Sequence, residues 1–404
     1  MKNIISLLII SLFQLYGISS LYAQNTSEKQ IYKRSSLYSI LVSHHKEKFG
    51  EEIETVFFQI PIPDKFNDHD LAVKVITVPD NKVNESIITS FIERNEIAKH
   101  IVGRWFNRCP ETGVCNMELV ASRGLYNASY LDVERAKVSQ RGIGTLADAG
   151  ESLIDNTFVI VNDITYHDRN MDARITAAVL KVLLSPFGSF GQIAGEAVEA
   201  VMSEIKGFGV TVTSYLYQLE WNDNLAETFY RQYYIGENEQ DEAKRKAFNA
   251  SKDFKLKYIG KQSVTSGQTS MQGLSTFDPY AMIRKVCTRA IDASIVALQR
   301  NYDEFKVKTP IFSVSPNITA KIGLKEGVSE DSRFEVLEES LDKNGKASYR
   351  RIGIIQPIKG KIWDNRYMAF EEGAVGAKLE ATTFRKISGD DFYPGMLIRE
   401  IKNQ

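Results

Sequence analysis

The side chains best suited to metal or acid–base chemistry gather around the end of one predicted strand. Asp163 lies within an apolar run, and His167 and Asp168 follow as that run ends. Carboxylates combined with imidazole are ligands that Zn²⁺ and Mn²⁺ accept. The same letters are also typical of a strand that ends in a solvated turn. The stretch therefore has two interpretations: a solvated turn, which we favour, or the site of a secreted metal-dependent hydrolase.

Motifs that would indicate an enzyme class are missing from the sequence. It contains no Walker loop, no Gly-x-Ser-x-Gly elbow and no His-Glu-x-x-His pair. Adjacent carboxylates occur at Glu51-Glu52 and Glu371-Glu372, where an exposed face is the more ordinary explanation than an acid–base pair. We therefore expect no catalysis, no bound metal and no cofactor.

Composition, length and net charge limit the class of protein and the kinds of partner to be expected. The 404 residues are 43% hydrophobic and 25% charged, which are ordinary globular values. This length predicts two domains with accessory segments. Lys and Arg number 50 against 51 Asp and Glu, so the net charge of −1 does not favour nucleic acid as a partner.

The first 23 residues have the pattern of a secretory signal peptide. Met1-Lys2-Asn3 is a short basic start, and Ile4 to Tyr22 is mostly apolar up to Ala23, which precedes polar residues. A membrane anchor is the weaker alternative, because a span needs about 20 apolar residues and Gln14 and Gly17 interrupt this run. We expect cleavage after Ala23 and an exported protein of the periplasm or the inner face of the outer membrane.

Export permits disulfides, and the three cysteines are interpreted accordingly. Cys109 and Cys115 flank the turn-like stretch Pro110-Glu111-Thr112-Gly113-Val114, which predicts a small disulfide-closed loop. Their spacing does not match a zinc or redox CxxC motif. Cys287 lies in an apolar helical pattern and is expected to be a buried free thiol.

Between residues 46 and 309 the pattern predicts an α/β domain, preceded by a loose segment over residues 24–45. Strands are expected at Ile53–Ile62, Leu71–Val78, Asn116–Ala121, Asn156–Tyr166, Val210–Trp221 and Phe254–Tyr258. A helix is expected after the capping residue Asn84, and another from Asp278-Pro279 to Phe305. The Ser/Thr/Gly-rich stretch 263–276 is expected to be a loop.

A helical hairpin is predicted over residues 173–209, inserted between two strands that could pair. It could be core, a surface facing a membrane or a partner, or, least in keeping with its charges, a transmembrane pair. We favour a packed or oligomer-facing amphipathic pair. The apolar residues expected to form its interaction surface are Leu180, Leu183, Leu184, Phe187 and Phe190. The partners expected are envelope proteins, a second copy of the chain or a peripheral membrane contact.

The order of elements resembles the periplasmic α/β domain of the curli secretion channel family. The resemblance rests on a helix at Thr145–Ile154, strands at Thr157–Tyr166 and Val210–Trp221, and a late helix at Tyr280–Phe305. It covers about residues 50–305. This sequence lacks the lipid-attachment cysteine at its predicted cleavage site, and its insertion is expected to be helical rather than a pair of membrane strands. The resemblance therefore implies an envelope protein but no channel activity.

Residues 310–404 are expected to form a small all-β barrel or sandwich, because short strands alternate with Gly-containing turns. This region resembles the small barrel that ends flagellar assembly protein T, on the residues Ala320–Val328, Phe334–Leu337 and Ile352–Ile355. The sequence thus predicts an α+β protein made of a curli-channel-like domain and a β domain. Both resemblances imply assembly at the envelope through protein–protein contacts.

Overall fold

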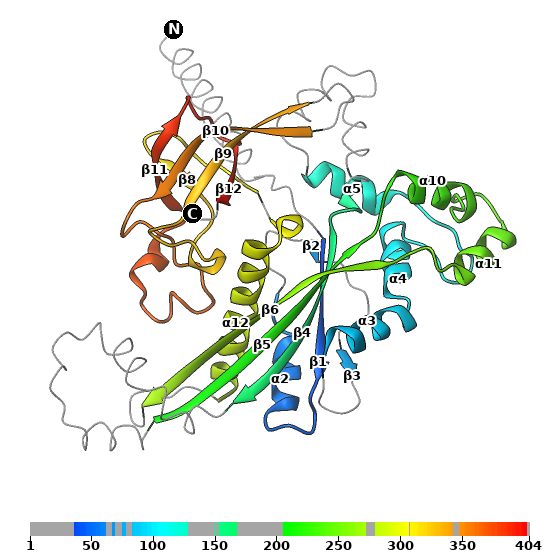
Figure 1. Ribbon diagram of the computed structural model, residues 1–404, viewed down its shortest axis with the longest axis horizontal. Helices are drawn as coiled ribbons and strands as arrows, with labels where there is room; N and C mark the ends of the chain where they lie inside the picture. Colours follow the sequence, from blue (N-terminus) through cyan, green and yellow to red (C-terminus); the bar gives the residue numbers. More distant parts are fainter. Residues whose placement is uncertain are drawn as a thin grey trace, which may run out of the picture.

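The computed structural model describes residues 36–61, 67–68, 75–77, 83–127, 150, 153–167, 205–271, 279–306, 308–341 and 347–401. These residues form a mixed α+β fold with two sheets, the second of them a nearly closed barrel. Figure 1 shows the long strands of the first sheet, helix α12 (Pro279–Asn301) beside them, and the barrel on the other side of that helix.

The first sheet has the strand order β2-β1-β4-β5-β6, with β3 also paired to β1. β1 (Ser36–Ser43) is parallel to β2 (Asn67–Asp68), β3 (Val75–Thr77) and β4 (Thr157–His167). β5 (Ile205–Leu219) and β6 (Leu256–Met271) are antiparallel to their neighbours and are the longest strands. A short parallel part and a long antiparallel part therefore share one sheet.

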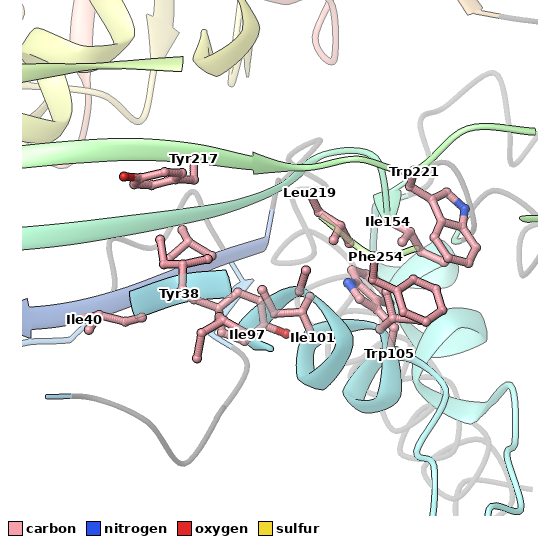
Figure 2. Packing of buried hydrophobic residues seen from close by; sticks show 14 of the residues in the cluster. Tyr38, Ile40, Ile97, Ile101, Trp105, Ile154, Tyr217, Leu219, Trp221 and Phe254 are labelled. Carbon is pink, nitrogen blue, oxygen red and sulfur yellow. The ribbon is translucent and has the colours of Figure 1, made fainter. Parts of the chain in front are cut away.

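One face of this sheet is covered by the helices α3 (Glu85–Arg94) and α4 (Ile97–Trp105). Alternate residues of β1 point to this face, as the period of two along a strand requires. Figure 2 shows Tyr38 and Ile40 of β1 packed near Ile97 and Ile101 of α4. Aromatic residues from α10 (Asp223–Gln232) and α11 (Glu242–Ala250) extend this cluster, and the rings of Phe106 and Phe229 stack at 4.2 Å.

The opposite face is covered by α2 (Gly50–Phe57) and α12. Leu37 and Leu41 of β1 point to it, together with Phe158 and Ile160 of β4. Helix α12 contributes a row of residues at helical spacing: Ile283, Val286, Cys287, Ala290, Ile291, Ile295 and Leu298. The sheet is therefore the middle of three layers, and β1 and β4 are covered on both faces.

The second sheet has the order β7-β12-β9-β10-β11-β8. Its strands are β7 (Thr309–Pro310), β8 (Ile318–Ala320), β9 (Arg333–Leu341), β10 (Ala347–Pro357), β11 (Thr382–Gly389) and β12 (Leu397–Ile401). The chain after β7 bonds to β8, where Phe312 N donates to Thr319 O at 2.7 Å and Thr319 N to Ser313 O at 2.9 Å. These bonds bring the two ends of the sheet together around a separate apolar cluster that includes Val336 and Ile355.

Several predictions from sequence are confirmed. β4 is a buried strand at the predicted place, and α12 follows Pro279. Asn84 caps α3, because its side chain accepts a hydrogen bond from Ile87 N at 3.1 Å. The all-β C-terminal region is confirmed as barrel-like.

Three local predictions in the first half of the chain are wrong. Residues 36–43 do not belong to a loose segment but form β1, an interior strand of the sheet. The stretch Ile53–Ile62, expected to be a strand, is helical up to Phe57, where α2 ends. Ile53, Val56 and Phe57 bury one face of this helix. The strand expected at Asn116–Ala121 is instead the start of helix α5 (Glu118–Asn127).

Two corrections concern the antiparallel part of the sheet. β5 begins at Ile205, so residues 205–209 are strand and not the end of a helical hairpin. β6 continues to Met271 through residues expected to form a loop. In both cases pairing with a neighbouring strand outweighs the weak local preference of small residues. The strand β3 falls within the predicted Leu71–Val78.

The barrel should fold independently, because its apolar cluster is built from residues of the barrel region alone. A fragment of residues 308–404 should give a β-sheet circular dichroism spectrum and a cooperative thermal transition. A matched fragment of residues 308–395 lacks β12 and with it the pairing to both β7 and β9, so it should be unfolded. A random-coil spectrum for the longer fragment would show that the barrel depends on the α/β domain.

Candidate functional site

Strand β6 forms one edge of the first sheet over 16 residues. The side of β6 that faces β5 is paired along its whole length. Leu256 pairs with Leu219 at one end, and Met271 pairs with Ile205 at the other. Within the described residues no strand pairs with its outer side. An edge of this kind presents unpaired backbone N–H and C=O groups that another chain can bond.

The first half of the β6 edge is closed by the chain itself. The hydroxyl of Tyr302 accepts a hydrogen bond from Lys261 N and donates one to Lys261 O, both at 3.0 Å. Gly260 makes room for this ring, because a Cβ there would lie 2.2 Å from the Tyr302 hydroxyl. A bulge beside Leu216 and Tyr217 bends the strand at the same point. Lys257 and Lys261 add the charges that commonly protect an edge.

The rest of the strand, residues 262–271, has none of this protection from the part of the chain that the structure describes, and we call it the neutral edge. It contains no charged residue and no proline. Since Lys261 directs both backbone groups outward, the alternation of an antiparallel ladder directs those of Ser263, Thr265 and Gly267 outward as well. On one face its side chains are held by β5, where the hydroxyls of Thr213 and Ser263 lie 2.8 Å apart and those of Thr211 and Thr265 lie 3.0 Å apart. The neutral edge is therefore a strand whose outward backbone groups pair with no other strand among the residues that the structure describes.

Sequence reasoning missed this site because polar small residues suggested a loop. The signal that could have found it is the alternation of Val264 with hydroxyl residues opposite a strongly predicted strand, Val210–Trp221. Ten residues without charge or proline next to such a strand fit a paired strand better than a solvated loop.

Asp163, predicted as a metal candidate, pairs with a histidine that follows the neighbouring strand β1, 119 positions earlier in the chain. His44 Nε2 lies 2.6 Å from Asp163 Oδ1, and His44 Nδ1 lies 3.7 Å from Glu47 Oε1. The side chains of His44 and Asp163 are 8% and 15% exposed. The hydrogen bond to Asp163 raises the pKa of His44, and the charges of Asp163 and Glu47 add to this against the opposing effect of burial. The pair ties the connection between β1 and α2 to β4.

Asp163 and His167 both lie on β4, four residues apart. The side chain of His167 lies outside the described part of the structure, so a metal site on these residues stays a prediction. Asp168 lies outside the described residues. Within the part of the chain that the structure describes, no three His, Cys, Asp or Glu side chains are grouped so that they could hold a metal ion.

Cys109 and Cys115 are free thiols in this structure, at the two ends of one tight loop. Backbone bonds close the loop, from Cys109 N to Val114 O at 2.9 Å and from Gly113 N to Cys109 O at 2.8 Å. Cys109 Sγ donates to Glu111 Oε2 at 3.0 Å, whereas burial raises the pKa of the Cys115 thiol. The disulfide stays a prediction. Cys287 is a buried free thiol, as expected, and burial raises its pKa to about 12.

Other predicted functional residues lie outside the described part of the chain. These are the predicted cleavage site Ala23 and the predicted interaction residues Leu180, Leu183, Leu184, Phe187 and Phe190. Among the helices that the structure does describe, none combines the length and apolar character needed to cross a bilayer. No protein-family model matches the chain, and a search of curated proteins finds no match.

The pairing of His44 makes a prediction about stability and pH. The raised pKa means that the imidazolium stabilises the fold below its unfolded pKa of about 6.5, and that this contribution is lost as the pH rises through the folded value. At pH 6, His44→Gln should lower the free energy of unfolding by about 1.5–3 kcal/mol. Urea denaturation of both proteins should show this difference shrinking at pH 8.5. A difference that grew with pH would contradict the ion pair.

The cysteine loop gives a second prediction. Mass spectrometry of protein exported to the periplasm and kept from reductant should show Cys109 and Cys115 joined, while Cys287 is alkylated only after unfolding. Two freely alkylated thiols at 109 and 115 in native exported protein would contradict the pairing.

Proposed function

We propose that the protein is a non-catalytic component of the cell envelope that works in assembly or secretion through protein–protein contacts, and that the neutral edge of β6 makes the main contact. The single observation that carries this proposal is an ordered, uncharged strand edge without a partner in the described residues. Edge strands recognise extended protein segments by adding a strand to the sheet, with main-chain hydrogen bonds supplying affinity.

A second copy of the chain is the partner that the edge fits best. Antiparallel pairing of two neutral edges about a two-fold axis would place uncharged residues opposite uncharged residues. Continuing the pairing inward is blocked, because the hydroxyl of Tyr302 already bonds the outward backbone groups of Lys261. The self-pairing is therefore limited to residues 262–271.

The location proposed is the periplasm or the inner face of the outer membrane, and it is supported by the signal-peptide pattern that ends at Ala23. The resemblances to the curli secretion channel family and to flagellar assembly protein T point to the same compartment. The part of the predicted hairpin that precedes β5 would add a second contact close by, since β4 ends at His167 and β5 begins at Ile205, beside the end of the neutral edge at Met271.

The proposal predicts that one backbone N–H decides assembly. Thr265→Pro removes an N–H that points away from β5, so the internal ladder survives and an edge proline is tolerated. Light scattering coupled to size-exclusion chromatography should show a folded monomer for this variant and a concentration-dependent oligomer for the wild type.

The matched control is Thr265→Val, which loses the same hydroxyl contact with Thr211 but keeps the backbone N–H. It should assemble like the wild type. A wild type that is monomeric at every concentration, or a Thr265→Pro variant that assembles normally, would refute the neutral edge as the contact.

A further inference from the structure

Tyr302 occupies the place on the β6 edge that a residue of an added strand would take. Its hydroxyl accepts a hydrogen bond from Lys261 N and donates one to Lys261 O, each at 3.0 Å. These are the two backbone bonds that a residue of a neighbouring antiparallel strand exchanges with the residue that faces it. An added strand therefore cannot bond Lys261 while Tyr302 is in place, and its pairing must begin beyond that residue.

Helix α12 holds Tyr302 in this position. Tyr302 follows the last residue of that helix, and its backbone N donates to Leu298 O at 2.9 Å. The side chain packs against the core cluster between the sheet and α12, and α12 lies beside β6 (Figure 1). A Cβ on Gly260 would lie 2.2 Å from Tyr302 Cζ, so the glycine leaves the space that the ring fills. Two separate segments of the chain thus build this contact, which we call the Tyr302 stop.

Beyond the Tyr302 stop, the edge has a short and defined set of outward positions. Because the backbone groups of Lys261 point outward, those of residues 263, 265, 267, 269 and 271 point outward as well in a regular antiparallel ladder. The shift in the pairing of β5 with β6 lies on the other side of Lys261, so it does not disturb this alternation. β6 ends at Met271, which makes these five positions the ones that two copies can use.

These limits favour one register for two copies of the edge. With the two-fold axis at Gly267, residue 263 faces 271, residue 265 faces 269 and Gly267 faces itself, so all five outward positions are bonded. An axis at Ser266 bonds four of them, because residue 271 would face Lys261, whose backbone groups are taken. An axis at Gln268 also bonds four, because residue 263 would face a position beyond the end of β6.

We infer that Tyr302 is a positioning residue that fixes the register of the paired edges, with the two-fold axis at Gly267. This role rests on the proposed function, because it takes the neutral edge as the contact between two copies. Without the Tyr302 ring, the backbone of Lys261 becomes available, and an axis at Ser266 then bonds six positions against five for an axis at Gly267. Removing the Tyr302 stop should therefore move the axis by one residue.

Cysteine cross-linking of the full chain reads this register. Residues between the outward positions face one another in non-hydrogen-bonded pairs, with Cα atoms about 4.5 Å apart, a separation that a disulfide spans. An axis at Gly267 makes Ser266 face Gln268, whereas an axis at Ser266 makes Ser266 face itself. The experiment mixes Ser266→Cys and Gln268→Cys proteins in equal amounts, oxidises them mildly with diamide, and identifies the linked peptides by mass spectrometry.

With Tyr302 in place, the link between positions 266 and 268 should exceed the link of position 266 to itself by about tenfold, because the second register bonds one position fewer in each copy. Adding Tyr302→Ala to both proteins should reverse this ratio. The matched control is Tyr302→Phe, which removes the hydroxyl but keeps the ring in the way of an added strand. It should keep the link between positions 266 and 268.

The arm with Tyr302 in place needs no substitution at residue 302, so the register is tested even if Tyr302→Ala does not fold. The inference is overturned if position 266 links mainly to itself in that arm, or if folded Tyr302→Ala protein keeps the link between 266 and 268. If Thr265→Pro still dissociates the oligomer in that case, the neutral edge remains the contact and only the assigned register is wrong. No link in any background, together with a monomer by light scattering, would overturn both the register and the proposed contact.

Discussion

The buried side chain of Asn162 connects the parts of the α/β domain. Its Nδ2 donates to Ser39 Oγ at 3.0 Å and to Ile40 O at 3.3 Å on β1, and its Oδ1 accepts from Ser214 Oγ at 2.8 Å on β5. The Ser214 and Ser294 hydroxyls then lie 2.8 Å apart, which extends the network to α12. Leaving such a buried polar group unpaired costs about 1–3 kcal/mol. A slip of β4 against β1 or β5 would break these buried bonds, so the Asn162 network favours the observed register of the three strands.

Helix α12 serves both domains because its two faces differ in chemistry. The face toward the sheet is apolar, whereas Lys285 and Arg289 point to the barrel and both bond the carboxylate of Glu372. Arg289 also donates to Tyr367 O at 2.8 Å. Burial, with the nearby charges of Arg289 and Arg366, lowers the pKa of Lys285 to about 8. Directional ion pairs at one end of the helix, and the Arg300–Glu400 pair at the other, thus fix the orientation of the barrel on the sheet domain.

Prediction from sequence succeeded for those elements whose local residue pattern matches their place in the folded domain. β4 contains the apolar run Phe158–Val161 because both faces of the sheet are covered there, and α12 has a regular apolar stripe and a proline at its start. Prediction from sequence failed where the structure of a segment depends on a residue or strand far away in the chain. β6 is a strand because β5 pairs with it, and the contact between His44 and Asp163 joins residues 119 positions apart. Ile53, Val56 and Phe57 have helical spacing, but a run this short and mixed also fits the period of a strand, so the local pattern does not distinguish the two.

The pairing of β7 with β12 sets an order of folding during synthesis. The last strand of the sheet domain, β6, ends at Met271 and α12 ends at Asn301, so all its described layers exist before most of the barrel has been made. The barrel's first strand must instead wait for Leu397–Ile401, about 90 residues later, because β12 pairs with both β7 and β9. A chain that emerges N-terminus first can therefore pack its first domain while its second is still open, and any premature stop before residue 397 leaves barrel strands unpaired beside a finished domain.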